Sequence, residues 1–92
     1  MDQTDEGLIR RAHAAAARQS VKLRADLMQP GATEVAEVNG RRYVVLCNER
    51  GIFAVYRVRK PDGILKGLKR WPKELDQQFD PYYQPAPGEV AA

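Results

Sequence analysis

Hydrophobic and basic residues alternate from Glu34 to Trp71 with a period of two, which is typical of β-strands. Three turn signals interrupt this alternation: Asn39-Gly40, Glu49-Arg50-Gly51 and Pro61-Asp62-Gly63. Short turns that contain glycine join antiparallel neighbours, because glycine readily adopts the positive φ that tight hairpins need. The pattern therefore predicts an antiparallel meander of short strands.

The lengths of the turns predict which residues lie opposite each other, and hence which side chains share a face of the sheet. A three-residue turn closed by Gly51 places Val44 opposite Tyr56. If the third turn closes in the same way, Leu68 also lies opposite Tyr56. One face is then nearly all apolar, and we expect it to form the core. Its predicted members are Val35, Val44, Leu46, Ile52, Ala54, Tyr56, Val58 and Leu68.

The opposite face is mixed in character. An apolar part adjoins a basic aromatic part in which Tyr43 faces Arg57 and Arg41 faces Arg59. Like charges directly opposite each other destabilise a sheet. Either an anionic or acidic partner binds there, or one of the registers differs. The apolar part comprises Val45, Cys47, Phe53 and Val55, and the face also holds Ala36, Val38, Leu65 and Lys69.

Residues Thr4 to Met28 are predicted to form one helix. Thr4 is a suitable N-cap, and Pro30-Gly31 ends the helical pattern. Apolar residues fall on one stripe that should pack against the sheet. This stripe consists of Leu8, Ile9, Ala12, Ala16, Leu23 and Leu27, and a separate basic stripe consists of Arg11, Arg18 and Lys22.

A second, shorter helix is expected after Trp71. Pro72 suits a first helical position, and Asp80-Pro81 would end the helix. Leu75 and Phe79 would share a face that can cover part of the second sheet face, with Trp71 as an anchor at the bend. Segment 64–71 also fits a helical stripe, so the pattern leaves open whether it is strand or helix.

The predicted fold is α+β: a long N-terminal helix packed on a three- or four-stranded antiparallel meander, followed by a short C-terminal helix. We expect one domain over residues 1–80 and a disordered tail rich in proline and alanine over 81–92. Nothing in the sequence resembles a membrane span or a signal peptide. A single cysteine, Cys47, cannot form an internal disulfide, so we expect a cytoplasmic protein.

The formal net charge of +3 conceals an uneven distribution. All fifteen lysine and arginine residues lie between Arg10 and Lys73, together with only five acidic residues, so this segment carries a charge of +10. A basic centre favours an acidic or polyanionic partner.

Residues with catalytic or metal-binding chemistry are sparse. His13 is the one histidine, Cys47 is predicted inside a strand, and Ser20 is the one serine. A structural zinc site normally takes four such ligands, and the glycines do not form a phosphate-binding loop. We therefore expect no catalytic residues, no metal, no cofactor and no enzymatic activity.

Two binding functions remain. An aromatic ring among arginines on a sheet can stack bases and neutralise phosphates, which predicts weak binding of single-stranded or duplex nucleic acid. The residues expected to take part are Arg41, Tyr43, Arg57, Arg59 and Lys69, helped by Arg11, Arg18 and Lys22. The alternative is an interface with another protein or a second copy of the chain. Its expected residues are Val45, Cys47, Phe53 and Val55.

Overall fold

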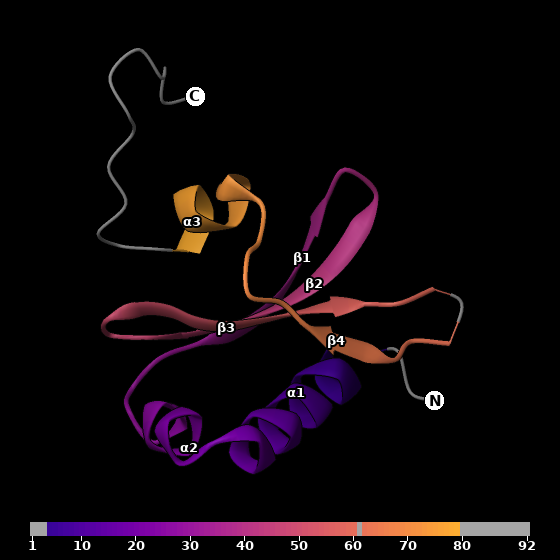
Figure 1. The fold of residues 1–92 in the computed structure, drawn as a ribbon. Coiled ribbons are helices and arrows are strands. Elements are labelled where there is room, and N and C mark those ends of the chain that lie inside the picture. The colour runs from indigo at the N-terminus through magenta and orange to yellow at the C-terminus, as the bar shows by residue number, and fades with distance from the viewer. Residues whose placement is uncertain (1–3, 61, 80–92) are drawn as a thin grey trace.

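The computed structural model describes residues 4–60 and 62–79, and it confirms the α+β architecture. Helices α1 and α2 precede a four-stranded antiparallel sheet with the strand order β1-β2-β3-β4, and α3 follows (Figure 1). The elements are α1 Asp5–Gln19, α2 Val21–Leu27, β1 Thr33–Val38, β2 Arg41–Asn48, β3 Gly51–Val58, β4 Leu65–Gly67 and α3 Lys73–Phe79. The predicted helix end at Asp80-Pro81 and the predicted tail lie outside the described residues.

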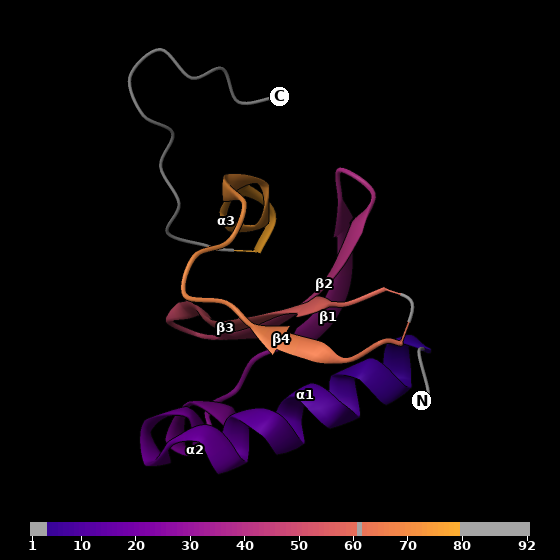
Figure 2. The same ribbon diagram turned by 45° about the vertical axis from the view of Figure 1, so that its right-hand side comes forward.

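The sheet separates two hydrophobic cores. Figure 2 shows α1 and α2 along one face of the sheet and α3 on the other face. In the first core, Leu8, Ala12 and Ala16 of α1 are buried against strand residues that include Val44 and Leu46. The predicted helix stripe is thus confirmed as the packing face, because every member of it belongs to this core or packs against it.

The prediction of one continuous helix over Thr4 to Met28 is wrong, because the helix breaks at Ser20. Ser20 is extended, with φ −161° and ψ 158°, and its Oγ accepts a hydrogen bond of 3.1 Å from the Leu23 amide as the N-cap of α2. Arg24 reaches back across the break and donates from Nη2 to the Ala17 carbonyl at 3.1 Å. Serine favours such a break because its hydroxyl can accept a hydrogen bond from a backbone N–H and so cap a new helix.

The first hairpin has the predicted register. Asn39 and Gly40 both have positive φ, of 52° and 76°, as a two-residue hairpin turn requires. Val35 pairs with Val44 and Glu37 with Arg42, as the turn length predicts. Before β1, the chain passes so close to β2 that a Cβ on Gly31 would lie 2.2 Å from the Cys47 carbonyl oxygen.

The register predicted for the second hairpin is correct away from the turn but wrong next to it. Leu46 pairs with Ala54 as expected, but Cys47 pairs with Ile52, so Phe53 is an extra residue in a β-bulge. The bulge exchanges two predicted positions: Phe53 packs on the first core, and Ile52 packs on the second core. The physical reason is that Asn48 pairs with Gly51 and leaves a two-residue loop in place of the expected three.

The third hairpin differs from its prediction by one residue. Tyr56 pairs with Gly67 rather than with Leu68, and Val58 pairs with Leu65. A shift of one residue moves side chains to the opposite face. Leu65 therefore packs on the first core and Leu68 on the second, the reverse of the expectation. Segment 64–71 contains only the short strand β4 and no helix.

The second core lies between the sheet and α3. Leu75 is 0% exposed and belongs to the same cluster as Val45 and Val55. Trp71 is half-buried against this cluster, and its Nε1 donates a hydrogen bond of 2.9 Å to Asp76 Oδ1. Trp71 thus packs at the bend before α3, as its position before Pro72 predicts.

Candidate nucleic-acid interface

A basic cleft opens where the two outer hairpins diverge. The register between β2 and β3 ends at the pair Tyr43 and Arg57, and beyond it the β1–β2 hairpin and the end of β3 point in different directions (Figure 1). The twist of a sheet separates the ends of neighbouring strands in this way. The space between them is a cleft of about 410 Å³. The described residues that line it are Asn39, Gly40, Arg41, Arg57, Val58, Arg59 and Lys60.

The divergence resolves the conflict between Arg41 and Arg59. Both residues line the cleft, but they are not partners in the sheet, because the pairing stops two residues earlier. The repulsion predicted between Arg41 and Arg59 as cross-strand partners is therefore absent from the described sheet. Arg41 is exposed and Arg57 is half-buried, and neither guanidinium forms an ion pair with a described residue.

Arg59 is the member of the cleft that has a carboxylate partner. Its Nη2 pairs with Asp62 Oδ2, and its Nε donates to Asp62 Oδ1 at 3.3 Å. These hydrogen bonds, with one of 3.1 Å from the Ile64 amide, lower the pKa of Asp62 from 3.8 to about 2. The same carboxylate raises the pKa of Arg59. Arg59 thus brings less free positive charge to the cleft than Arg41 and Arg57 do.

The sequence pattern does not indicate Lys60 as a binding residue, but Lys60 closes one end of the cleft. Its Nζ donates a hydrogen bond of 3.3 Å to the Gly40 carbonyl, so it joins the β3 end to the tip of the first hairpin. A further cation, Lys66, pairs with Arg57 and so shares its face of the sheet. Lys60 lies beyond the end of β3, where an alternating pattern no longer assigns a face.

Tyr43 is not available as a stacking surface. The residue is only 5% exposed and belongs to the second core, on the face that α3 covers. Alternation placed Tyr43 beside Arg57 correctly, but it gave no information on the depth of the ring. Any binding at this cleft must therefore depend on its cations rather than on base stacking by Tyr43.

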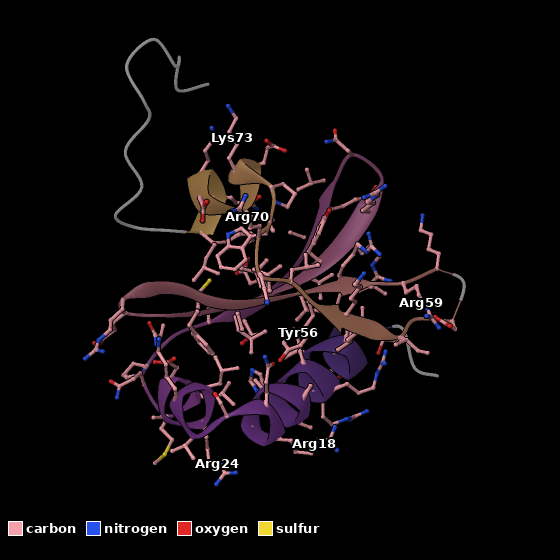
Figure 3. The ribbon with its side chains drawn as sticks, viewed as in Figure 1. Arg18, Arg24, Tyr56, Arg59, Arg70 and Lys73 are labelled. Carbon is pink, nitrogen blue, oxygen red and sulfur yellow. The ribbon has the colours of Figure 1, made fainter. Side chains whose placement is uncertain are left out.

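The other predicted nucleic-acid residues lie away from the cleft. Lys69 lines a different pocket, beside the middle of β3. Arg11 donates from Nη1 to the Gly63 carbonyl at 3.0 Å, and so attaches α1 to the turn after β3. Arg18 and Lys22 are exposed on the helical layer, and Figure 3 shows Arg18 on the side of α1 that faces away from the sheet.

The residues of the predicted protein interface do not form one exposed surface. Val45 and Val55 are buried in the second core with Leu75, and Cys47 is half-buried there. Phe53 faces the first core because of the bulge. The apolar part of the sheet face is therefore covered by α3 of the same chain.

Groups with potential catalytic chemistry are separated from one another. His13 Nε2 lies 2.7 Å from Thr33 Oγ1 in an exposed contact that links α1 to β1. Within residues 4–60 and 62–79, no three histidine, cysteine or acidic side chains lie close enough together to hold a metal ion. None of the described helices is long and apolar enough to cross a membrane.

Comparisons with known proteins give no relative. No protein-family model matches the chain, and neither the curated proteins nor the solved structures contain a match. Functional inference therefore depends on the geometry and charge of the chain itself.

Proposed function

We propose that this protein is a non-enzymatic binding protein that binds nucleic acid weakly, through the phosphates, at the basic cleft. The observation that carries this proposal is the cleft of about 410 Å³ with three arginines and one lysine among its described lining residues and no acidic residue. A concave site lined by one sign of charge concentrates the opposite charge. The proposed setting is the cytoplasm, in keeping with the free thiol of Cys47.

The arrangement favours contacts with the phosphate backbone over readout of bases. Arginine guanidinium groups bind phosphate oxygens through paired N–H donors, and Arg41 and Arg57 have no carboxylate competitor among the described residues. The nearest aromatic ring on this face, Tyr43, is buried. We therefore expect little sequence preference and a strong dependence on salt.

The test is a titration of fluorescein-labelled single-stranded and duplex DNA, followed by anisotropy at several salt concentrations. Replacing both Arg41 and Arg57 with Gln removes two phosphate contacts. The log-log salt slope should then fall by about 1.4 to 1.8, because each phosphate neutralised contributes about 0.7 to 0.9. The variant should keep the thermal unfolding midpoint of the parent, since neither side chain forms an ion pair within the described chain.

The matched control removes two charges that lie near the other end of the sheet, one on α2 and one in the turn between β2 and β3. Lys22 and Arg50 line a pocket beside the turn between β2 and β3, and replacing both with Gln changes the net charge equally. Binding through the cleft predicts a smaller effect for this control than for the cleft variant. Equal losses would show attraction to net charge without a site, and no binding at low salt to either DNA would reject the function.

A further inference from the structure

The outer edge of β3 is open along its first half. β4 pairs only with the last three residues of β3, and one more bond, from the Leu68 amide to the Val55 carbonyl at 3.0 Å, extends this contact. From Gly51 to Ala54, β3 pairs only with β2 within the part of the chain that the structure describes. In Figure 1 the turn between β2 and β3 projects past β4, so this edge faces outward. An edge of this kind can accept a further strand.

A pocket adjoins the open edge and can receive a side chain. It has a volume of about 270 Å³, and its walls come from the end of α1, α2, β3, the last residue of β4 and the segment after it. Leu23, Phe53 and Leu68 form an apolar part of its wall, while on a polar side the Tyr56 hydroxyl donates to Gln19 Oε1 at 3.1 Å. The bulge is what turns Phe53 toward this side of the sheet.

The charges along the edge favour an acidic partner. Lys69 lines the pocket at one end of the open segment. At the other end, a second pocket is lined by Lys22 and Arg50, with Asp26 as the acidic residue among its described lining. A peptide with a carboxylate at each end of a short apolar stretch would complement this arrangement.

A second copy of the chain fits this edge less well. Pairing two copies of β3 edge to edge would bring the same cations together, and like charges across an interface are unfavourable. A β-bulge also twists an edge and opposes flat pairing between identical strands. A short flexible peptide can follow the twist, and at about 3.3 Å per residue, a peptide of about five residues spans the open segment.

We propose that the open edge of β3 binds an extended acidic peptide of a partner protein as an added strand, with one apolar side chain in the pocket beside Phe53. The backbone of the added strand bonds to the open edge between Gly51 and Ala54. Its flanking carboxylates lie near Lys69 at one end and near Lys22 and Arg50 at the other. This binding mode is independent of the basic cleft, which lies at the opposite end of β3.

The experiment is an NMR titration of the full chain with the acetylated, amidated peptide Glu-Val-Leu-Val-Glu. The amide resonances from Gly51 to Val55, together with that of Lys69, should shift most. The same peptide with N-methyl groups on its central amides keeps the side chains but loses the donors, so it should bind about tenfold more weakly or not at all. The basic peptide Lys-Val-Leu-Val-Lys should also bind more weakly.

Variants of the protein separate this site from general attraction of charge. Lys69→Glu should weaken the binding of the acidic peptide about three- to tenfold. Lys66→Glu, on the neighbouring strand and next to Arg57, should leave the affinity for the peptide nearly unchanged. Shifts concentrated at Arg41 and Arg57, equal binding of the N-methylated peptide, or no shifts at all would overturn the assignment. Shifts at the edge that grow with protein concentration alone would assign it to a second copy instead.

Discussion

The carboxylate of Asp62 accepts three hydrogen bonds at the turn after β3, two of them from Arg59 and one from the Ile64 amide. These bonds hold its pKa at about 2 instead of 3.8. We predict that Arg59→Gln raises this pKa most of the way to 3.8, while the Ile64 amide keeps it slightly lower. A pH titration that follows the NMR signal of the Asp62 carboxyl carbon measures this pKa in the parent and in the variant.

The lowered pKa of Asp62 also fixes the sign of its effect on stability. A carboxyl whose pKa is lower in the folded state than in the unfolded state stabilises the fold above its unfolded pKa. This contribution is present above about pH 3.8 and is lost as the pH falls through about 2. Arg59→Gln should reduce this acid-sensitive part of the stability. An unchanged Asp62 pKa in that variant would contradict the pairing.

Tyr56 makes a different kind of single-residue contact, because its hydroxyl joins the sheet to the end of α1. The hydroxyl donates to Gln19 Oε1 at 3.1 Å, and the residue is 5% exposed. Tyr56→Phe keeps the ring in the first core and removes this hydrogen bond, so urea unfolding should show a loss of about 0.5 to 1.5 kcal/mol. Tyr43→Phe removes a hydroxyl that forms no hydrogen bond with any residue of 4–60 and 62–79, and should cost less.

The buried Tyr56 hydroxyl makes stability depend on alkaline pH as well. Burial raises its pKa above 10.0, so the unfolded state loses the proton first as the pH increases. The contribution is fully present below pH 10 and declines as the pH rises through the higher folded value. Tyr56→Phe should weaken this decline above pH 10, and an equally steep decline in the variant would reject the assignment.

Ser20 determines the shape of the helical layer. Its Oγ caps α2, and the resulting break lets Leu23 and Leu27 pack against the first core. Ser20→Ala removes the cap and should cost about 0.5 to 2 kcal/mol in urea unfolding. Ser20→Asp, which can accept the same hydrogen bond, should retain most of the stability. Equal losses in both variants would show that the hydroxyl does not act as a cap.

Local turn chemistry explains which elements could be predicted from the sequence. Asn39-Gly40 has one favoured geometry, and the hairpin around it has the predicted register. The turn closed by Gly51 is compatible with a three-residue loop or with a two-residue loop and a bulge, and alternation does not distinguish these. The register predicted for the hairpin of β3 and β4 was wrong by one residue, so the predicted faces of Leu65 and Leu68 were exchanged.

The candidate site could be predicted only in part, for a related reason. Alternation along strands correctly placed Arg41 and Arg57 on one face. It could not predict the cleft, because a cleft results from the twist that separates strand ends. It also could not predict that α3 buries Tyr43 or that Lys60 closes the cleft, since both depend on contacts between elements distant in the sequence.

One sheet separates two cores, and the second core depends on one short helix. Seven residues form α3, and Leu75 is its buried residue. A helix of this length is not stable by itself in water, so its order comes from packing on the sheet. The apolar part of the sheet face is therefore available to another protein only if α3 moves away.

This dependence gives a prediction that separates the intramolecular cover from a protein interface. Leu75→Asp places a charge in the second core, so α3 should leave the sheet and expose Val45 and Val55. The variant should lose about 2 to 5 kcal/mol of stability and show a mass that increases with concentration in sedimentation experiments. Gln78→Asp, on the exposed side of α3, should match the parent.

The parent should remain a monomer at every concentration, because Leu75 already occupies the position that a partner would take. If the parent itself associates, and Leu75→Asp abolishes that association while the chain stays folded, then α3 forms part of the interface.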